Sequence, residues 1–559
     1  MMQRSTQVLL LSSRLDPMRE KALRTALALG PEALVIAPEA RLPESLAGFH
    51  AVVLDGPQDD RQNTSDALQA FVLHGGALLA LGAIPDSPSD SLAGLLGVTV
   101  DERRPHGEVF GKCAPVDSDL VRRIDDEFAL VERFQPLRIL RAGVTAIIYV
   151  NWALTDEVAA VEQRHGAGRL VATSLGESEV SLNAPAFQTL LRRALRPPQR
   201  ATLTGPINAA IVGYGPTGGM GYVHGTGIGA TDGLQLVAIC DRSPDRCEAA
   251  AASFPGVSTF AEADAIARDP NVGLVFIATP PVSHAALALQ MLEAGKHVVC
   301  EKPLCLTTGE ADRLIAAAAA HHLMLTVNQN RRWDPDYLAV RRAVQTGMLG
   351  EVFNVETFVG GFEHPCRYWH SDEDISGGAA FDWGSHYVDW TLQLMPGVPE
   401  FVSATAHKRV WHDVTNADQV RIRMTWSDGR EAEFTASDVA AVRKPKFYIQ
   451  GTAGTLEGRY RPLAFESLDP AVGYQRDEPH FAEAPAELRL ARYESGYGIT
   501  ETTLPPQPRR PFALHRNVAD HLLLGEPLAV TPESVRTVVA VLQAAEQSAR
   551  SGGAPVRLQ

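Results

Sequence analysis

Short apolar runs alternate with helical patterns over the first 200 residues of the chain. Four aliphatic runs predict strands at residues 7–13, 33–37, 51–56 and 77–82. Between them apolar positions recur at helical spacing, as at residues 65–74, where the pair Gly75-Gly76 ends the helix. Strands that alternate with helices predict a parallel sheet. We therefore expect a first α/β domain at residues 1–196, followed by a proline-rich linker at 197–206.

The alternation of strands and helices restarts at Ile207 and continues to residue 327 as a second α/β domain. Beyond residue 328 apolar and polar positions alternate, which is typical of half-buried strands. These alternating runs lie at residues 351–361, 419–426, 431–436 and 447–450. They predict an α+β domain with an open, mostly antiparallel sheet at residues 328–559. Residues 459–510 lack clean periodicity and predict long loops, and two amphipathic helices follow at 514–524 and 532–551.

Composition narrows the classes of function. The 559 residues are 45% hydrophobic and 21% charged, which is typical of a globular protein of several domains. The apolar runs stay short of the ~20 residues that a membrane helix needs. A formal net charge of −15 argues against nucleic-acid binding, and the six cysteines form no Cys-x-x-Cys pair. We expect a cytoplasmic protein that binds neither a membrane nor a nucleic acid.

A glycine-rich turn follows the first strand of the second domain. Gly213-x-Gly215-x-x-Gly218 leaves bare backbone where a pyrophosphate could approach the next helix. The next strand ends in Asp241, whose carboxylate could accept hydrogen bonds from a ribose diol, which favours NAD. Arg242 could instead meet a 2′-phosphate, so NADP stays open. The alternative interpretation is a tight turn that binds no ligand.

The segment after this turn is rich in glycine. Six glycines crowd the region in which the first helix of such a domain would begin: Gly218, Gly219, Gly221, Gly225, Gly227 and Gly229. Each interior glycine costs a helix about 1 kcal/mol relative to alanine. We therefore expect a lengthened loop. After the third strand, Thr279-Pro280 with His284 would border the nicotinamide, although His284 could equally be a surface residue of a helix N-terminus.

The apolar run His-Val-Val-Cys ends by delivering Glu301, Lys302 and Pro303. Ligands of open α/β sheets bind outside the carboxyl ends of such strands. We therefore place Glu301 in the cofactor site. Lys302 at this edge would lose solvation, which favours a neutral amine that exchanges a proton with a hydroxyl. The alternative is a surface lysine after an ordinary strand.

Asp382, His386 and Asp389 are spaced at i, i+4 and i+7, so a helix would carry them on one face. A carboxylate one turn from an imidazole can orient the ring and raise its basicity. A metal site and a solvated helix face are the alternatives, and we predict no metal because further ligands at typical spacing are missing. Five residues either line a sugar pocket or belong to the core: Arg331, Trp333, Tyr368, Trp369 and His370.

Together the glycine turn, the Ala-Thr-Pro-Pro segment with His284, the Glu-Lys-Pro motif and Asp382-x-x-x-His386 resemble the Gfo/Idh/MocA family over residues 207–559. The resemblance implies a Rossmann domain followed by an open antiparallel sheet, and NAD(P)-dependent oxidation or reduction of a hydroxyl of a sugar, glycoside or cyclitol. Carried over, Lys302, Asp382 and His386 are the catalytic residues, with His386 as general base and Lys302 polarising the reacting oxygen. A cis Lys302-Pro303 bond is also implied.

Residues 1–196 resemble the trehalose-utilisation family, which is related to class I glutamine amidotransferases and implies a flavodoxin-like parallel sheet. The motifs are Ala-Phe-Val-x-x-Gly75-Gly76, Leu-Ala-Gly-Leu-Leu-Gly97 and Gly168-Arg-Leu-Val-Ala-Thr. An amidotransferase needs a cysteine at a strand-to-helix elbow. The strand after Gly76 lacks one and Cys113 is distant, so we expect no glutaminase activity. The association of this family with disaccharide dehydrogenases favours a glycoside substrate.

The sequence thus predicts an NAD(P)-dependent sugar or glycoside dehydrogenase. A redox-neutral glycosidase or lyase that recycles bound NAD is one alternative. A non-catalytic protein that senses a sugar or dinucleotide is another. The open sheet offers a face that could pair with a copy of itself, so we also expect a homo-oligomer.

Overall fold

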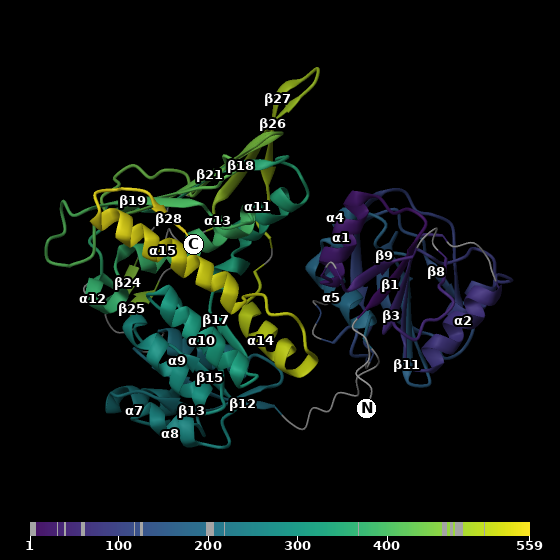
Figure 1. Ribbon diagram of the computed structural model, residues 1–559, viewed down its shortest axis with the longest axis horizontal. Helices are drawn as coiled ribbons and strands as arrows, with labels where there is room; N and C mark the ends of the chain where they lie inside the picture. The colour runs from purple at the N-terminus through teal and green to yellow at the C-terminus, as the bar shows by residue number, and fades with distance from the viewer. Residues whose placement is uncertain are drawn as a thin grey trace. The chain divides into compact units, whose positions relative to one another are not determined.

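The computed structural model describes residues 7–30, 32–37, 41–57, 62–116, 118–122, 124, 127–196, 206–216, 219–366, 368–460, 467–469, 473–475, 485–507 and 509–558. The chain divides into two compact units, Met1–Thr202 and Leu203–Gln559 (Figure 1). The predicted linker at 197–206 lies, apart from its last residue, outside the described residues. Within the described part of the chain, no helix is both long and apolar enough to cross a bilayer.

The first unit contains a nine-stranded sheet in the order β2-β1-β3-β4-β11-β10-β9-β6-β7. The first five of these strands pair in parallel, as the sequence predicted. They are β2 (Leu34–Ile36), β1 (Val8–Ser12), β3 (Ala51–Asp55), β4 (Ala77–Leu81) and β11 (Gly168–Thr173). Apart from the edge strand β2, in which Ile36 is exposed, their apolar side chains are buried on both faces, which is why they read as continuous aliphatic runs.

The other half of this sheet is antiparallel, and the prediction of a purely parallel sheet was wrong for it. Its strands are β10 (Thr155–His165), β9 (Thr145–Trp152), β6 (Gly107–Cys113) and β7 (Glu127–Glu132). One face of this half is solvated, so β6 alternates buried and exposed positions and its apolar signal is weak. The helices of this unit are α1 (Pro17–Leu27), α2 (Gln62–Leu73), α3 (Ser91–Leu96), α4 (Glu179–Leu182) and α5 (Pro185–Ala194), and β5 (Val98–Val100) pairs with β8 (Leu137–Ile139).

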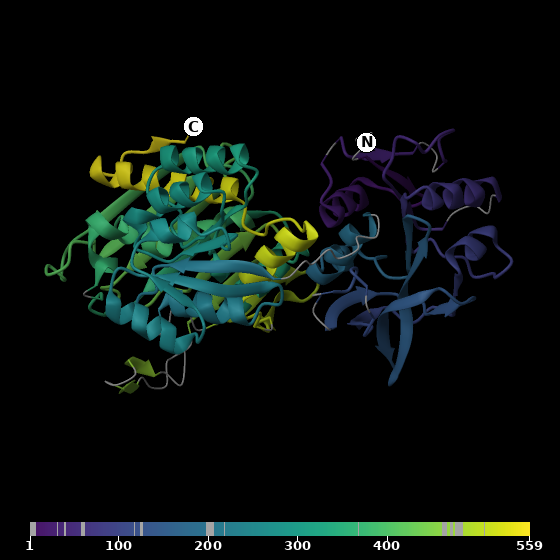
Figure 2. The same ribbon diagram turned by 90° about the horizontal axis from the view of Figure 1, so that it is seen from below.

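The second unit begins with a six-stranded parallel sheet in the order β14-β13-β12-β15-β16-β17. This is the doubly wound order of the Rossmann fold, with helices on both faces (Figure 2). Its strands are β12 (Ile207–Val212), β13 (Leu234–Cys240), β14 (Ser258–Phe260), β15 (Leu274–Ile277), β16 (His297–Cys300) and β17 (Leu325–Val327). Its helices are α6 (Met220–Gly229), α7 (Pro244–Ser253), α8 (Ala263–Arg268), α9 (His284–Glu293) and α10 (Thr308–Ala320), the last of which begins with a capping box formed by Thr307 and Glu310.

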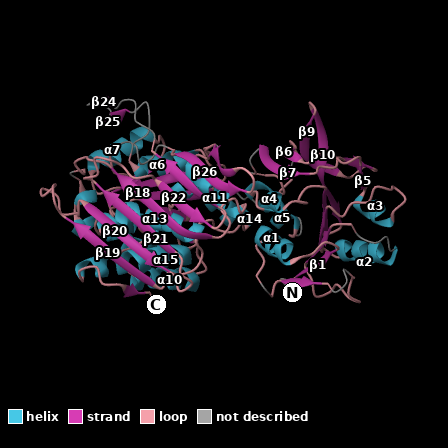
Figure 3. Cartoon of the chain, turned by 90° about the horizontal axis from the view of Figure 1, so that it is seen from above, coloured by secondary structure: helices cyan, strands magenta, loops and turns pink. Residues whose placement is uncertain are grey.

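A second nine-stranded sheet follows, in the order β27-β26-β23-β22-β18-β21-β20-β19-β28. Only the β18–β21 pair is parallel, so the predicted mostly antiparallel sheet is confirmed. The strands are β18 (Val352–Gly360), β19 (Phe401–His407), β20 (Gln419–Thr425), β21 (Glu431–Ser437), β22 (Phe447–Gly451), β23 (Gly454–Arg459), β26 (Glu487–Glu494), β27 (Gly498–Leu504) and β28 (Val556–Arg557). In Figure 3 these strands lie side by side above the helices, which cover only one face. The predicted irregular segment 459–510 contains the regular hairpin β26–β27, which projects from the sheet in Figure 1.

Helices α11 (Pro335–Gln345), α12 (Glu373–Ser376), α13 (Ala379–Leu394), α14 (Ala513–Leu524) and α15 (Pro532–Arg550) complete this unit. Both terminal helices were predicted. Leu514 and Val518 of α14 and Val535 of α15 pack in the core of the Rossmann domain, although the sequence assigned this segment to the α+β domain. Farther along, Val541 and Leu542 enter the core beneath the antiparallel sheet. Helix α15 therefore joins the two cores of the second unit.

Candidate active site

The glycine turn lies between β12 and α6, at the carboxyl edge of the Rossmann sheet. Gly213 has φ +94° and Gly215 has φ +69°, a region that side chains rarely adopt. A Cβ on Gly213 would stand 2.8 Å from the carbonyl carbon of Ala278, whereas a Cβ on Gly215 would meet nothing within 4 Å. Open space beside bare backbone fits a pyrophosphate. Gly218, also predicted to bind the cofactor, lies outside the described residues.

Asp241 holds the glycine turn from the end of β13. Its Oδ2 accepts hydrogen bonds from the N–H groups of Tyr214 and Gly215, both at 3.0 Å, and the N–H of Ser243 donates to Oδ1 at 3.0 Å. The carboxylate is thereby fixed beside the turn, where the ribose of a dinucleotide would lie. Arg242 follows it and is exposed. The turn and its acid therefore fit a nicotinamide dinucleotide.

The glycine-rich segment after the turn forms helix α6, so the predicted lengthened loop was wrong. Its glycines allow close packing. A Cβ on Gly225 would stand 2.4 Å from the ring of Phe254, and one on Gly227 would stand 2.7 Å from His515 Nε2. Close approach of the helix to its neighbours explains why glycine is used despite its cost in helical stability.

Thr279 and Pro280 follow β15 on the same edge of the sheet, and His284 begins α9 behind them. The ring of His284 is fully buried, with Nε2 at 2.7 Å from the carbonyl oxygen of Thr279 and Nδ1 at 2.6 Å from that of Pro303. Burial lowers the pKa of His284. Both ring nitrogens thus face backbone carbonyl groups, and His284 ties the Thr279 loop to the segment that carries Lys302.

Glu301 lies at the centre of a buried polar chain. Its Oε1 accepts from Asn328 Nδ2 at 2.6 Å and lies 2.9 Å from His224 Nε2, and His224 Nδ1 lies 3.0 Å from His515 Nε2. Burial alone would raise the pKa of Glu301, but His224, Asn328 and the charge of Lys302 outweigh it and lower the pKa. The carboxylate, which the sequence placed in the cofactor site, joins α6, β17 and α14 beneath Lys302.

Lys302 forms an ion pair with Asp382 of α13. The ammonium Nζ lies 2.6 Å from Asp382 Oδ1 and 3.2 Å from the carbonyl oxygen of the same residue. Burial would raise the pKa of Asp382, but the charge and hydrogen bond of Lys302 lower it. The sequence predicted a lone desolvated amine at Lys302, and the structure instead places a carboxylate against it. The Lys302-Pro303 bond is cis, as the resemblance implied.

His386 lies one helical turn after Asp382 and is buried. Its Nδ1 lies 3.0 Å from Gln329 Oε1, and Gln329 Nε2 donates to the carbonyl oxygen of Ser385 at 2.9 Å. Because the second bond fixes the amide, Nδ1 carries the proton and Nε2 keeps its lone pair. Burial and the charges of Lys302 and Arg331 lower the pKa of His386 well below 6.5. The ring is therefore a neutral imidazole close to Lys302.

Gln329, rather than an acid of the predicted helical face, orients this imidazole. Asp389, the third member of that face, is buried and accepts hydrogen bonds from Arg332, 2.7 Å from its Nε. The sequence analysis missed Gln329, although its place just after β17 is a signal of the same kind that marked Lys302. His224 and His515 were missed as well, and no local pattern in the sequence points to them.

Arg331 lies close to this centre. Its guanidinium is 4.9 Å from the centroid of the Trp383 ring, and Nη1 is 3.2 Å from Asp334 Oδ2. The charge of Arg331 contributes to the lowered pKa values of Asp382 and His386. Trp333 instead packs against the hydrophobic core of the Rossmann domain.

Tyr368, Trp369 and His370 lie in the loop that precedes α12. The rings of Trp369 and His370 stack with centroids 3.6 Å apart, while Tyr368 is 76% exposed. The pKa of His370 is lowered by burial, raised in part by the nearby charge of Asp382 and lowered further by that of Lys302. The charges of Lys302 and Asp382 therefore reach the His370 ring.

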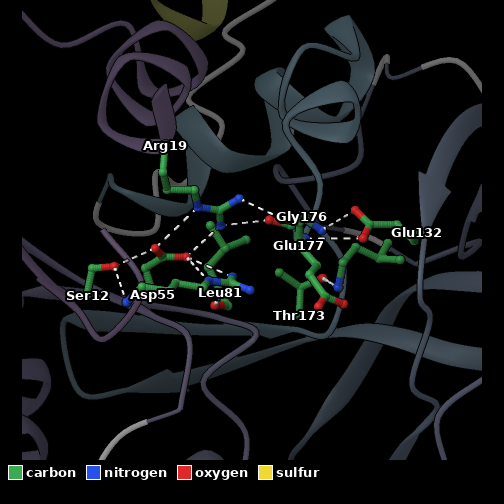
Figure 4. A network of polar contacts seen from close by, with 10 residues as sticks. Ser12, Arg19, Asp55, Leu81, Glu132, Thr173, Gly176 and Glu177 are labelled. Carbon is green, nitrogen blue, oxygen red and sulfur yellow. Dashed lines mark hydrogen bonds and ion pairs between the residues drawn. The ribbon is translucent and has the colours of Figure 1, made fainter. Parts of the chain in front are cut away.

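The first unit also has a carboxyl edge with polar residues, shown in Figure 4. Asp55 at the end of β3 is fully buried and lies 2.7 Å from Ser12 Oγ, 2.8 Å from Arg14 Nη2 and 2.6 Å from Arg19 Nη2. Gly82 follows β4 with φ +63°, and a Cβ there would stand 3.2 Å from Arg14 Nη2. Arginine thus fills the space beside this elbow, where an amidotransferase of the predicted type would carry its cysteine.

A doubly wound parallel sheet, a bare glycine turn and an acid at the end of the second strand define a nicotinamide-dinucleotide-binding protein. Residues 207–329 match the model of the oxidoreductase family with an NAD-binding Rossmann fold, and residues 337–457 match that of the GFO/IDH/MocA C-terminal domain. An uncharacterized oxidoreductase of Schizosaccharomyces pombe is 32% identical over 264 residues, which are 46% of this chain and 68% of that protein. The chain belongs to the Gfo/Idh/MocA family of oxidoreductases.

Other relatives have named activities. The scyllo-inositol 2-dehydrogenase (NADP(+)) IolW of Bacillus subtilis is 27% identical over 352 residues, covering 62% of this chain and 94% of the relative. The inositol 2-dehydrogenase of Rhizobium meliloti is 29% identical over 287 residues, covering 50% of this chain and 83% of the relative. Among solved structures, an NAD-binding protein from Listeria innocua aligns with a TM-score of 0.54 at 27% identity, covering 63% of this chain and 97% of that one. The resemblance of residues 1–196 to the trehalose-utilisation family stays a prediction.

Proposed function

We propose that this protein is an NAD(P)-dependent dehydrogenase that acts on a hydroxyl or keto group of a sugar, glycoside or cyclitol. The observation that carries the proposal is the Lys302–Asp382 pair, 2.6 Å apart, with the neutral imidazole of His386 one helical turn away. An ammonium and an unprotonated imidazole at one site are the groups that oxidation of an alcohol requires. The inositol substrates of two relatives support a polyhydroxylated substrate.

Each residue of this centre has a distinct role in the proposal. His386 Nε2 accepts the hydroxyl proton during oxidation and returns it during reduction. Lys302 donates a hydrogen bond to the reacting oxygen and stabilises its developing negative charge. Asp382 holds the ammonium in place, and Gln329 fixes the tautomer of His386. Arg331, Trp369 and His370 contact the other hydroxyls of the substrate, with Tyr368 as a supporting residue of this wall, whereas Trp333 belongs to the core.

The cofactor site consists of the glycine turn and the loops beside it. When bound, NAD(P) supplies a nicotinamide ring that accepts or donates the hydride. Gly213 and Gly215 would hold the pyrophosphate, together with Gly218 of the predicted motif, which lies outside the described residues, and Thr279 and Pro280 would border the nicotinamide. Asp241 binds the ribose hydroxyls, which favours NAD, and Arg242 is the residue that would meet the 2′-phosphate of NADP. Glu301 and His284 do not contact the cofactor in this proposal and instead hold the backbone of these loops in place.

Nicotinamide absorbance tests the proposal against a panel of sugars, glycosides and cyclitols, with both NAD and NADP. We expect turnover with at least one compound, and about a thousandfold lower kcat/KM for it with Lys302→Met under the same conditions. Formation of a product without a net change in nicotinamide absorbance would identify the redox-neutral alternative. A chain that binds NADH but converts no compound of the panel by either assay would contradict the proposal.

A further inference from the structure

Three loops leave the same end of the antiparallel sheet beside the Lys302–Asp382 pair. Parallel pairing sets Gly360 at the end of β18 opposite Ser437 at the end of β21. Antiparallel pairing sets Gln419 at the start of β20 opposite both Ser437 and His407 at the end of β19. The loops at 361–371, 408–418 and 438–446 therefore emerge together.

Hydrogen bonds join these loops to each other and to the reaction centre. Asn416 Nδ2 donates to the carbonyl oxygen of His370 at 2.7 Å, and the charges of Lys302 and Asp382 act on the His370 ring. The N–H of Glu363 donates to the carbonyl oxygen of Asp438 at 3.2 Å. Burial and the charge of Asp382 raise the pKa of Asp438 to about 7, so this carboxyl also lies near the centre.

An aromatic surface continues outward from Asp438. Trp411 Nε1 donates to the carbonyl oxygen of Asp438 at 3.1 Å. Edge-on contacts set the Trp411 ring 5.9 Å from that of Phe362 and 4.8 Å from that of His364. His364 Nε2 lies 3.0 Å from both carboxylate oxygens of Asp413. We call Phe362, His364, Trp411 and Asp413 the Trp411 surface.

The composition of the Trp411 surface indicates what it binds. Phe362 is 54% exposed and the Asp413 side chain is 50% exposed, so apolar rings and hydrogen-bond acceptors face solvent together. An apolar protein partner would bury the carboxylate of Asp413, which carries a free-energy penalty. A sugar ring suits both features, because its C–H face packs on aromatic rings while its hydroxyls donate to a carboxylate such as that of Asp413.

We propose that the Trp411 surface binds a second sugar ring, so that the substrate is a glycoside or disaccharide whose other ring reacts at Lys302 and His386. This inference rests on the proposed dehydrogenase function and narrows it. Asp438 lies between the two positions, since its carbonyl oxygen holds Trp411 while its carboxyl is near Asp382.

The test compares glucose with cellobiose, maltose and trehalose in the wild-type protein and in Trp411→Ala. We expect the best disaccharide to have a kcat/KM at least tenfold above that of glucose. Trp411→Ala should lower kcat/KM for that disaccharide at least tenfold more than for glucose, mainly through KM, and Trp411→Phe should restore most of the loss. Tyr493→Ala, which removes a 72% exposed ring from strand β26, is the matched control and should keep the wild-type ratio.

Three results would overturn the inference. One is equal kcat/KM for glucose and all three disaccharides. Another is an equal loss for both classes in Trp411→Ala. The third is a change of oligomeric state in Trp411→Ala, seen by sedimentation, which would make the surface a contact between copies of the chain.

Binding measurements distinguish failure of the second-ring site from failure of the proposed dehydrogenase activity. If no sugar is converted, calorimetric titration with the same disaccharides still tests the surface. Binding of cellobiose, maltose or trehalose that is lost in Trp411→Ala and kept in Tyr493→Ala would support the second-ring site. Absence of binding by all three would overturn it.

Discussion

The protein contains two sheets whose parallel strands end at a carboxyl edge, and the two edges are occupied in different ways. In the first unit, Asp55 is surrounded by Ser12, Arg14 and Arg19. Arg19 reaches further to the backbone carbonyl groups of Gly176 and Glu177 (Figure 4). In the Rossmann domain, Gly215 leaves open space, and Lys302 and His386 keep groups that can exchange protons.

This difference shows that strand order alone does not make a binding site. The carboxyl edge of an open α/β sheet is where ligands bind in general. At the first edge the polar side chains form hydrogen bonds and ion pairs with one another, so their polar atoms are already engaged within the protein. At the second edge glycine removes side chains, and the polar groups come from the ends of the Rossmann strands and from helix α13. The chemistry therefore depends on the residues that end each strand.

Replacement of Lys302 by methionine has the largest expected effect. It should lower kcat/KM by about a thousandfold, because the developing charge on the reacting oxygen loses its donor. Affinity for NADH, measured by fluorescence titration, should change little. Lys296→Met, which removes a lysine bonded only to the backbone carbonyl groups of Asp269 and Val272, should alter thermal stability rather than the chemical step. Equal activity losses in the two variants would contradict the role of Lys302.

Replacement of Asp55 by alanine tests the closed edge. It leaves the buried guanidinium of Arg19 without its carboxylate, which should destabilise the first unit by about 3 kcal/mol. Urea unfolding followed by circular dichroism measures this change, and kcat should stay within twofold. Asp101→Asn breaks the exposed pair with Arg138 in the same unit and should leave the midpoint unchanged. If folded Asp55→Ala lost more than twofold in kcat, this edge would take part in the reaction.

The pH profile should reflect the neutral imidazole of His386. The base must be unprotonated, and burial lowers its pKa well below 6.5, so its acid limb should lie below pH 6.5. Asp438, with a pKa raised to about 7, titrates higher, so the profile is also recorded with Asp438→Asn. His386→Gln should lower kcat about a hundredfold and remove the limb. An acid limb that persists in His386→Gln would assign the base to another group.

The smallest expected effect concerns the packing of α6. Gly225→Ala sets a Cβ 2.4 Å from the ring of Phe254 and should destabilise the protein by about 1 to 3 kcal/mol. Gly229→Ala, in the same helix, meets nothing within 4 Å and should stabilise it by about 0.5 kcal/mol. Thermal unfolding measures both. Opposite signs in the two variants confirm that close approach, rather than flexibility, selects the glycines.

Much of the fold could be predicted from the sequence, because buried parallel strands read as unbroken aliphatic runs. The first four strands and the Rossmann strand β16, which Glu301 follows, are examples. The antiparallel half of the first sheet was missed because its solvated face dilutes the apolar signal. Helix α6 was missed because glycine propensity is a local property, whereas the contacts with Phe254 and His515 come from distant segments.

The residues of the candidate site also divide into those that the sequence predicted and those that it did not. The motifs that follow strands pointed to Lys302 and Asp241, since the end of a strand is visible in sequence. The partners of these residues come from far along the chain: Gln329 lies 57 residues before His386, and His224 lies 77 residues before Glu301. Such pairings depend on how helices pack on the sheets. The homo-oligomer and the cytoplasmic location stay predictions.

The most direct test of the account is a double-mutant cycle on kcat/KM with Lys302→Met and His386→Gln. Groups that act on one reacting oxygen at one site lose their effect together, so the double variant should be about as active as the less active of the two single variants. Losses that multiply in full would mean that Lys302 and His386 act independently, and would contradict a single reaction centre.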